Sequence, residues 1–275
     1  MIAVRRWLAE RLLDVLVESP IQRGKYRLAQ LGALLLDGIP IHSRYGPYLH
    51  TRFADSTFWL AARYGNDEMM ALLSDLSSAD GFIDIGANIG LTTCFAQTRC
   101  AAVLSLEASS REFAELQRNC ALLTAPPPVV LLAAAADRSG FLPFRIGHIS
   151  HSGGNSLGAV HSTAEQQQLV QAVRIDDLLN DDALSEWPAM QLAWDRHQLV
   201  VKIDVEGFEA AVLGGMSLLL SERRCRKVIV EINDQRAAGI GMAFDVDAYM
   251  QSLGYSPSVD PAGRLHFDQC FIPRR

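Results

Sequence analysis

The fold of this chain is decided by the stretch FIDIGANIG, which runs from Phe82 to Gly90. A short apolar run ends in an acid, a turn bracketed by Gly86 and Gly90 follows, and a helical pattern then begins. This order of strand, glycine turn and helix is how α/β proteins present backbone N–H groups to a nucleotide-like ligand. We interpret both glycines as points where the backbone approaches that ligand closely; a purely structural tight turn is the alternative.

The spacing of the turn differs from that of a dinucleotide site, which requires G-x-G-x-x-G. Here the turn reads G-A-N-I-G, with Asp84 two residues ahead of the first glycine. A carboxylate at that place suits a ligand that carries an ammonium group better than one that carries only phosphates. S-adenosylmethionine (SAM) is such a ligand.

Strand and helix patterns alternate from residue 81 onward, which predicts a parallel sheet covered on both faces. The expected strands are 81–86, 102–107, 129–135, 199–205 and 227–232, and the expected helices are 89–98, 109–122 and 208–221. We therefore predict a ligand-binding α/β domain over 77–275. Residues 1–76 are predicted to form an extension of helices and a small hairpin.

Two sites at strand ends fit a nucleoside. Glu107 ends the second strand about twenty residues after the glycine turn, where an acid accepts hydrogen bonds from ribose hydroxyls; an exposed strand-end Glu is the alternative. Ala135, Ala136 and Asp137 come at the end of the third strand, where they would lie beside an adenine ring. A plain turn explains them equally well, because Asp137 is followed by residues that favour turns.

The second strong signal is KIDVEGFE, which runs from Lys202 to Glu209. Strand alternation places Lys202, Asp204 and Glu206 on one side. Three charges on a buried central strand are costly without partners, so we expect them at the carboxyl end of the sheet, where open α/β sheets bind ligands. The alternative is a structural ion cluster that anchors the next helix.

Further candidates lie nearby. Asp204, Glu231 and Asn233 together would offer oxygen ligands to a divalent cation such as Mg²⁺, but we expect Glu231 to pair with Lys202 and no metal to bind. A long polar loop over 147–168 carries three histidines. One of them could act as a general base, although surface residues are the simpler interpretation. The three are His148, His151 and His161.

The composition restricts the class of protein. The 275 residues are 49% hydrophobic and 20% charged, and the net charge of −6 disfavours nucleic-acid binding. Five unpatterned cysteines favour reduced thiols and a cytoplasmic location. Residues 1–52 carry eight basic and four acidic side chains, a net +4, which leaves −10 for the rest. This basic segment is either a solvated helix face or a contact for anionic lipid.

These residues resemble the FkbM family of SAM-dependent methyltransferases over roughly residues 64–233. The resemblance rests on the glycine turn, on Leu106-Glu107, on Asn119, on the R-I-D-D-L segment from Arg174, on K-I-D-V-E-G and on Val230-Glu231-Ile232. It implies a class I sheet of seven strands with an antiparallel last strand. It also implies methyl transfer to oxygen, typically of a sugar or polyketide hydroxyl.

The resemblance also implies roles. Gly86, Ala87 and Asn88 would hold the methionine end of SAM, Asp84 its ammonium region and Glu107 the ribose. Asp204 or Glu206 would orient or deprotonate the acceptor, and Lys202 would tune them. The family usually has E-P where this chain has Glu107-Ala108, which changes the adenine wall. Residues 180–198, with Trp187 and Trp194, look long enough to shape the substrate pocket.

Two other classes share part of the pattern. A nicotinamide-dependent oxidoreductase would need G-x-G-x-x-G and gives no reason for the K-I-D-V-E-G stretch. A catalytically silent module would keep the sheet, but the intact acids at the strand ends argue against it. The acceptor favoured here is a sugar of a glycan or glycolipid, with a natural-product hydroxyl second, and the sequence leaves the oligomeric state open.

Overall fold

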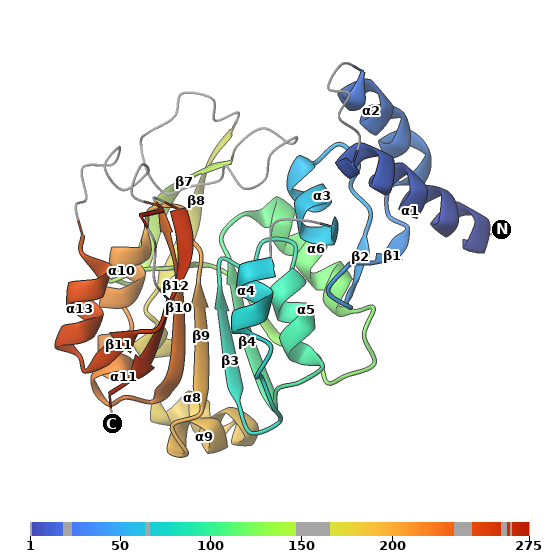
Figure 1. Cartoon of the computed structure of the whole chain (residues 1–275). Helices are drawn as coiled ribbons and strands as arrows, with labels where there is room; N and C mark the ends of the chain where they lie inside the picture. Colours follow the sequence, from blue (N-terminus) through green and yellow to red (C-terminus); the bar gives the residue numbers. More distant parts are fainter. Residues whose placement is uncertain are drawn as a thin grey trace.

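The computed structural model describes residues 2–18, 24–63, 67–146, 166–233, 244–259, 263–264 and 266–274 (Figure 1). Its centre is a seven-stranded sheet with the strand order β11-β12-β10-β9-β3-β4-β5. The strands are β3 (Gly81–Ile85), β4 (Ala102–Glu107), β5 (Val129–Leu132), β9 (Leu199–Ile203), β10 (Cys225–Asn233), β11 (Tyr255–Pro257) and β12 (His266–Pro273).

The sheet is mostly parallel, as predicted. Strand β3 pairs in parallel with β4 and β9, β4 with β5, and β9 with β10. Strand β12 lies antiparallel between β10 and β11. The predicted arrangement of seven strands with an antiparallel last strand is therefore confirmed. Because β12 runs in reverse, its beginning, at His266, lies beside the carboxyl end of β10, with His266 opposite Asn233.

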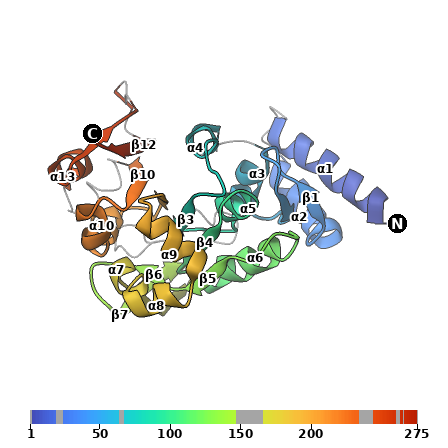
Figure 2. The same ribbon diagram turned by 90° about the horizontal axis from the view of Figure 1, so that it is seen from below.

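Helices cover both faces of the sheet (Figure 2). Side-chain alternation on β3 explains this, because Phe82 joins one buried cluster and Ile83 and Ile85 join another. The helices of the Phe82 face include α3 (Ser56–Arg63), α4 (Asp67–Leu72) and α5 (Leu91–Gln97). The opposite face packs α7 (Ile175–Leu178), α8 (Asp181–Ser185), α9 (Pro188–Asp195), α10 (Glu209–Gly214), α11 (Ser217–Ser221) and α13 (Val246–Ser252). Helix α6 (Ser110–Cys120) buries Leu116 against Cys94 of α5.

The N-terminal segment forms the elements expected from its sequence. Helices α1 (Ile2–Glu18) and α2 (Lys25–Leu36) precede a hairpin of β1 (Pro40–His42) and β2 (Tyr48–His50). Leu13 and Leu16 of α1 share a buried cluster with Phe82. The hairpin is joined to the glycine turn through Asn119 of α6, whose Oδ1 accepts the His50 backbone N–H at 2.8 Å and whose Nδ2 donates to Ile89 O at 2.7 Å.

Two predicted elements are interrupted. The strand expected over 129–135 ends its pairing with β4 at Leu132, and the chain continues as β6 (Ala134–Ala135). Strand β6 pairs with β8 (Gln166–Val173), which also pairs with β7 (Gly140–Ile146). The helix expected over 208–221 divides at Gly215, where a Cβ would lie 1.9 Å from Ala136 O. The close approach of that backbone explains the glycine and the break.

The prediction that residues 180–198 shape a substrate pocket is wrong. Helices α8 and α9 lie at the end of the sheet where the parallel strands begin (Figure 1). Gln198 O accepts the Gly81 N–H at the start of β3, and a Cβ on Gly81 would meet Met190 of α9. Trp187 and Trp194 pack on the sheet core. The segment closes the amino end of the sheet, opposite the strand ends that carry the candidate site.

Within the described part of the chain, no helix combines the length and the apolar character needed to cross a membrane.

Candidate functional site

The glycine turn that follows β3 is shaped by packing within the protein. Gly86 has φ +78°, and a Cβ there would lie 1.9 Å from Asp204 O. Gly90 has φ +90°, and a Cβ there would lie 2.6 Å from Leu116 Cδ1 of α6. The absence of a Cβ at these glycines therefore makes room for the loop after β9 and for α6, a packing reason that was not expected from the sequence. Gly86 also borders the cavity described below, whereas Gly90 does not.

Asp84 and Lys202 form a buried pair beneath the turn. Asp84 is fully buried, and its Oδ2 accepts hydrogen bonds from the hydroxyls of Thr92 and Thr93, each at 2.6 Å. Lys202 Nζ lies 3.3 Å from Asp84 Oδ1, 3.2 Å from Asp204 Oδ2 and 2.8 Å from Gly86 O. The prediction that Asp84 meets the ammonium group of a ligand is therefore wrong, because this carboxylate holds Lys202 and α5 instead.

The ammonium group of Lys202 keeps its charge in this environment. Burial alone would lower the pKa of Lys202, but the carboxylates of Asp204 and Asp84 more than offset it and raise that pKa above its ordinary value. Lys202 borders the cavity and neutralises part of the negative charge of Asp204. It is the positive centre of the site.

Glu107 lies at the end of β4, as predicted, with its carboxylate turned toward the glycine turn. Its Oε2 accepts the Asn88 N–H and its Oε1 accepts the Ser109 N–H, each at 2.8 Å. Burial raises the pKa of Glu107 to about 7, although these two hydrogen bonds act in the opposite direction. Each carboxylate oxygen has a second lone pair, so the group can still accept hydrogen bonds from a ligand.

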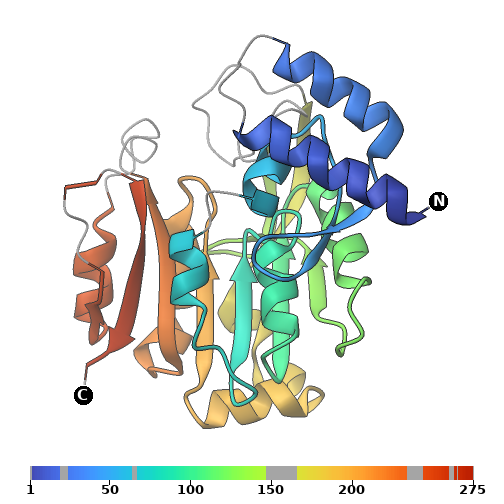
Figure 3. The same cartoon turned by 45° about the vertical axis from the view of Figure 1, so that its right-hand side comes forward.

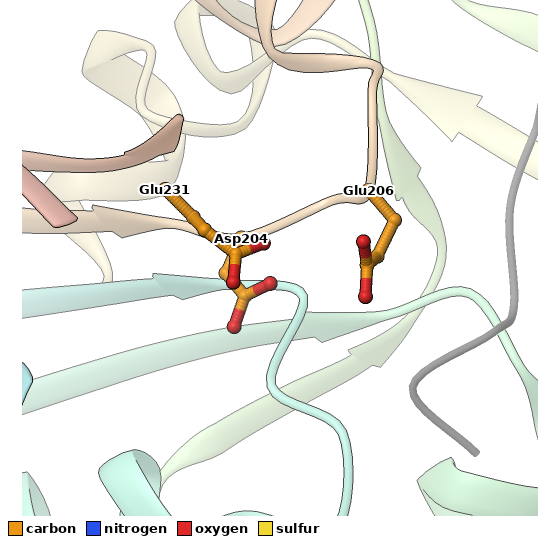
Figure 4. Close-up of side chains that lie close together, drawn as sticks. All are labelled: Asp204, Glu206 and Glu231. Carbon is orange, nitrogen blue, oxygen red and sulfur yellow. The ribbon is translucent and has the colours of Figure 1, made fainter. Parts of the chain in front are cut away.

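Three carboxyl groups meet where β9 and β10 end (Figure 4). Asp204 and Glu206 follow β9 and Glu231 lies on β10, and one oxygen from each lies within 4.8 Å of the others. Glu206 has φ +55°, an uncommon conformation for a residue other than glycine. Burial, followed by the neighbouring Asp204, raises the pKa of Glu231 well above its ordinary value, which favours a protonated carboxyl group at this position.

The beginning of β12 adds two side chains that we did not predict. His266 Nε2 lies 2.8 Å from Glu231 Oε1, so Glu231 pairs with His266 and the expected pair with Lys202 is wrong. Burial, followed by Asp204, raises the pKa of Asp268 to about 7. Polar residues at every second position, in His266-Phe267-Asp268, are the sequence signal that could have revealed this wall.

A cavity of about 390 Å³ joins these groups at the carboxyl ends of the parallel strands. One wall holds Gly86, Ala87, Asn88, Glu107 and Ala108. The neighbouring wall holds Lys202, Asp204, Glu206, Glu231, His266 and Asp268, and the two walls meet where Lys202 Nζ lies 2.8 Å from Gly86 O. Thr57, Leu60 and Ala61 of α3 and Met69 of α4 also line the cavity, and the part taken by α3 was not predicted from the sequence. The structure thus brings together all three predicted catalytic residues and most of the predicted cofactor-binding residues.

Ala136 and Asp137 lie outside this cavity, contrary to prediction. The Ala136 N–H donates to Val173 O, and Ala136 O packs on Gly215. The three preceding alanines, Ala133–Ala135, line the cavity with Phe144 of β7. The prediction misplaced this wall because the chain leaves the sheet at Leu132, three residues earlier than the pattern indicated.

The loop histidines His148, His151 and His161 lie outside the described residues. The carboxyl groups of Asp204, Glu206 and Glu231 offer the hard oxygen ligands that a divalent cation prefers. This cluster contains Asp204 and Glu231, which the sequence analysis named as possible metal ligands, and also Glu206.

Comparison with known proteins places this chain in a family. The methyltransferase FkbM domain model matches residues 84–257. A crystal structure of methyltransferase FkbM from Methylobacillus flagellatus KT is 14% identical, with a TM-score of 0.50. The match covers 96% of this chain and 59% of that protein, so this chain spans about three fifths of the length of that relative. No curated protein matches the sequence.

Other solved structures resemble the chain more weakly. The ribosomal protein L11 methylase from Lactobacillus delbrueckii subsp. bulgaricus is 10% identical, with a TM-score of 0.40 and coverage of 80% of each chain. The magnesium protoporphyrin IX methyltransferase from Synechocystis PCC 6803, solved with bound SAM, is 12% identical, with a TM-score of 0.35 and coverage of 74% of each chain. The family match includes the strand ends that carry Glu107, Asp204 and Glu231, and the chain belongs to the FkbM methyltransferase family.

Proposed function

We propose that this protein transfers a methyl group from SAM to a hydroxyl oxygen of a sugar in a glycan or glycolipid. The observation that carries the proposal is a single cavity with Glu107 and the glycine turn on one wall and Asp204, Glu206 and Glu231 on the other. Family membership decides against a nicotinamide-dependent oxidoreductase. The remaining alternatives are O-methylation of a polyketide or other natural product, and a catalytically silent module.

In this proposal the first wall binds SAM. Backbone groups of Gly86, Ala87 and Asn88 face the methionine end, and Glu107 accepts hydrogen bonds from the ribose hydroxyls. The adenine ring lies between Ala108 and the alanines Ala133–Ala135. When bound, SAM supplies the methyl group and, in its sulfonium, a good leaving group. Loss of the methyl group converts the sulfonium into the neutral sulfur of S-adenosylhomocysteine, which needs no stabilisation of charge. The remaining task of the protein is to align the acceptor and remove its proton.

The second wall handles the acceptor. The group that accepts the hydroxyl proton has to face the acceptor, and Asp204 lines the cavity with its Oδ2 held 3.2 Å from Lys202 Nζ. We assign the base to Asp204, with Glu206 as the alternative and Lys202 as its positioning partner. The raised pKa of Glu231 favours its protonated form, which can donate a hydrogen bond. Lys202 supplies the positive charge beside Asp204, and the mechanism proposed here assigns no step to a metal.

The polar side chains of the cavity favour a polyhydroxyl acceptor. Thr57, His266 and Asp268 border the space next to the three carboxyl groups and provide both donors and acceptors of hydrogen bonds. A sugar presents such groups in several directions. A panel of methyl glycosides and of hydroxylated polyketides, assayed for S-adenosylhomocysteine release, distinguishes the two acceptor classes.

Binding of SAM is the first test. Isothermal titration should show micromolar affinity for SAM or S-adenosylhomocysteine and none for NADH. Glu107→Gln is expected to weaken that affinity by about 10- to 100-fold, because hydrogen bonds to a charged group contribute roughly 1.5–3 kcal/mol. The matched control is Glu222→Gln at an exposed position of the surface, which should bind like the wild type. Unchanged affinity in Glu107→Gln would remove Glu107 from the ribose site.

The pH dependence of binding follows from Glu107. Its pKa of about 7 leaves roughly one tenth of the empty site ionised at pH 6, so SAM affinity should rise about tenfold between pH 6 and pH 8. The gain appears as pH rises because the ionised carboxylate is the better acceptor. SAM itself also titrates in this pH range, but its titration affects binding to the wild type and to Glu107→Gln equally. Titrations of both proteins across this range should differ in slope, and parallel profiles would contradict the assignment.

A further inference from the structure

Helix α2 packs its small residues inward and presents its leucines to solvent. Ala29 and Gly32 are buried, and a Cβ on Gly32 would lie 2.4 Å from Leu12 Cδ2 of α1. By contrast, Leu34 is 82% exposed and Leu35 is 66% exposed. A surface helix of a globular protein normally turns its large apolar side chains toward the core. The exposed leucines of α2 therefore indicate an interaction surface.

Helix α1 continues this apolar surface. It buries Leu13 and Leu16, yet leaves Val4, Trp7 and Val15 each more than half exposed. The two helices lie side by side (Figure 3), and the Arg5 guanidinium donates to Leu35 O at 2.7 Å. We define the α1–α2 face by its exposed apolar side chains, which are Val4, Trp7, Val15, Leu31, Leu34 and Leu35.

Basic side chains accompany the apolar ones. Arg5, Arg11 and Arg27 are exposed on these two helices. Helix α1 carries three Arg and three Asp or Glu, and α2 carries Lys25 and Arg27 without an acid, a net +2 over the two helices in a chain whose net charge is −6. Exposed Leu and Trp together with Arg on short helices is typical of helices that lie in the interface of an anionic bilayer.

The position of the α1–α2 face suits a membrane-facing role. Helix α1 packs on α3, and Thr57, Leu60 and Ala61 of α3 line the cavity. Both helices therefore lie toward the carboxyl ends of the strands, on the side of the molecule that carries the site (Figure 1). The opposite end of the sheet is closed by α8 and α9.

We propose that the α1–α2 face docks on an anionic lipid bilayer. The apolar side chains enter the boundary between headgroups and acyl chains, and Arg5, Arg11 and Arg27 contact lipid phosphates. A second copy of this chain is the less suitable occupant, because a symmetric contact would bring two basic faces together. This proposal does not depend on methyl transfer. It assigns the lipid contact to the α1–α2 face rather than to the N-terminal segment as a whole.

Vesicle co-sedimentation tests this proposal. The full chain should bind vesicles of phosphatidylcholine mixed with phosphatidylglycerol, and should bind phosphatidylcholine alone at least tenfold more weakly. Raised salt should weaken the binding because surface charges are screened. The combined variant Leu31→Gln, Leu34→Gln and Leu35→Gln should lose at least tenfold in affinity. These positions are exposed, so circular dichroism should show the wild-type fold.

A matched control uses exposed leucines elsewhere. Leu192 is 48% exposed on α9 and Leu218 is 51% exposed on α11, and the variant with Leu192→Gln and Leu218→Gln should bind vesicles like the wild type. Absence of binding by the wild type, or equal binding by the α2 variant, would overturn the proposal. A dimer in size-exclusion chromatography that becomes a monomer in the α2 variant, without vesicle binding, would show that a second copy covers the face.

Discussion

Asp204→Asn is expected to lower kcat by about 10²- to 10⁴-fold, the usual contribution of a general base, and to leave SAM affinity within about threefold of the wild type. Asparagine keeps the size of the side chain but cannot accept the hydroxyl proton. Lys202 remains held by Asp84 and by Gly86 O, so the strand ends should keep their arrangement. The loss should therefore appear in turnover rather than in binding.

The measurement is S-adenosylhomocysteine release with the best acceptor of the panel, together with isothermal titration of SAM. Glu206→Gln is assayed in parallel because its carboxylate lies in the same cluster. Asp182→Asn, at an exposed position of α8 at the far end of the sheet, serves as the control and should turn over normally. Full turnover by Asp204→Asn with loss in Glu206→Gln would move the base to Glu206.

Gly86→Ala is expected to destabilise the protein by more than about 4 kcal/mol, a size that is exceptional for a single substitution. The added Cβ would lie 1.9 Å from Asp204 O, which belongs to the backbone and cannot rotate away. The φ of +78° adds strain of about 1–2 kcal/mol. Urea unfolding followed by circular dichroism should show a much lower midpoint or no folded baseline.

Gly263→Ala separates the two contributions. Gly263 has φ +75° with no atom within 4 Å of an added Cβ, so this variant has the same backbone strain and none of the collision. It should lose only the strain contribution. Equal destabilisation of both variants would mean that the contact with Asp204 has no effect on stability.

The sequence predicted the centre of this fold well because local and global signals agree there. The strand over 102–107 has the predicted bounds, and the segment from Phe82 to Gly90 forms the predicted strand, turn and helix start. Three charges next to a buried strand correctly indicated that Lys202, Asp204 and Glu206 lie at a strand end. A polar group at such a place has few physical alternatives.

The sequence was less informative where distant segments decide the outcome. The direction of the Asp84 carboxylate depends on Thr92 and Thr93 of the following helix, and strand alternation does not reveal such partners. The position of Ala136 depends on β8 and on Gly215. The contribution of α3 to the cavity depends on how the N-terminal helices pack, for which no motif gave a sign. Tertiary contacts between remote parts of the chain determine the direction of Asp84, the position of Ala136 and the place of α3 at the cavity.

The reversed direction of β12 has a consequence for how such a protein diversifies. A parallel strand would bring its last residues to the site, but β12 brings its first ones, His266 and Asp268. The groups proposed to hold the nucleoside come from β3, β4 and their loops, several strands away. In the proposed arrangement, substitutions at the start of β12 would change the wall assigned to the acceptor and leave the wall assigned to the methyl donor intact, so that new specificities would arise in a part of the chain that is separate from the shared chemistry.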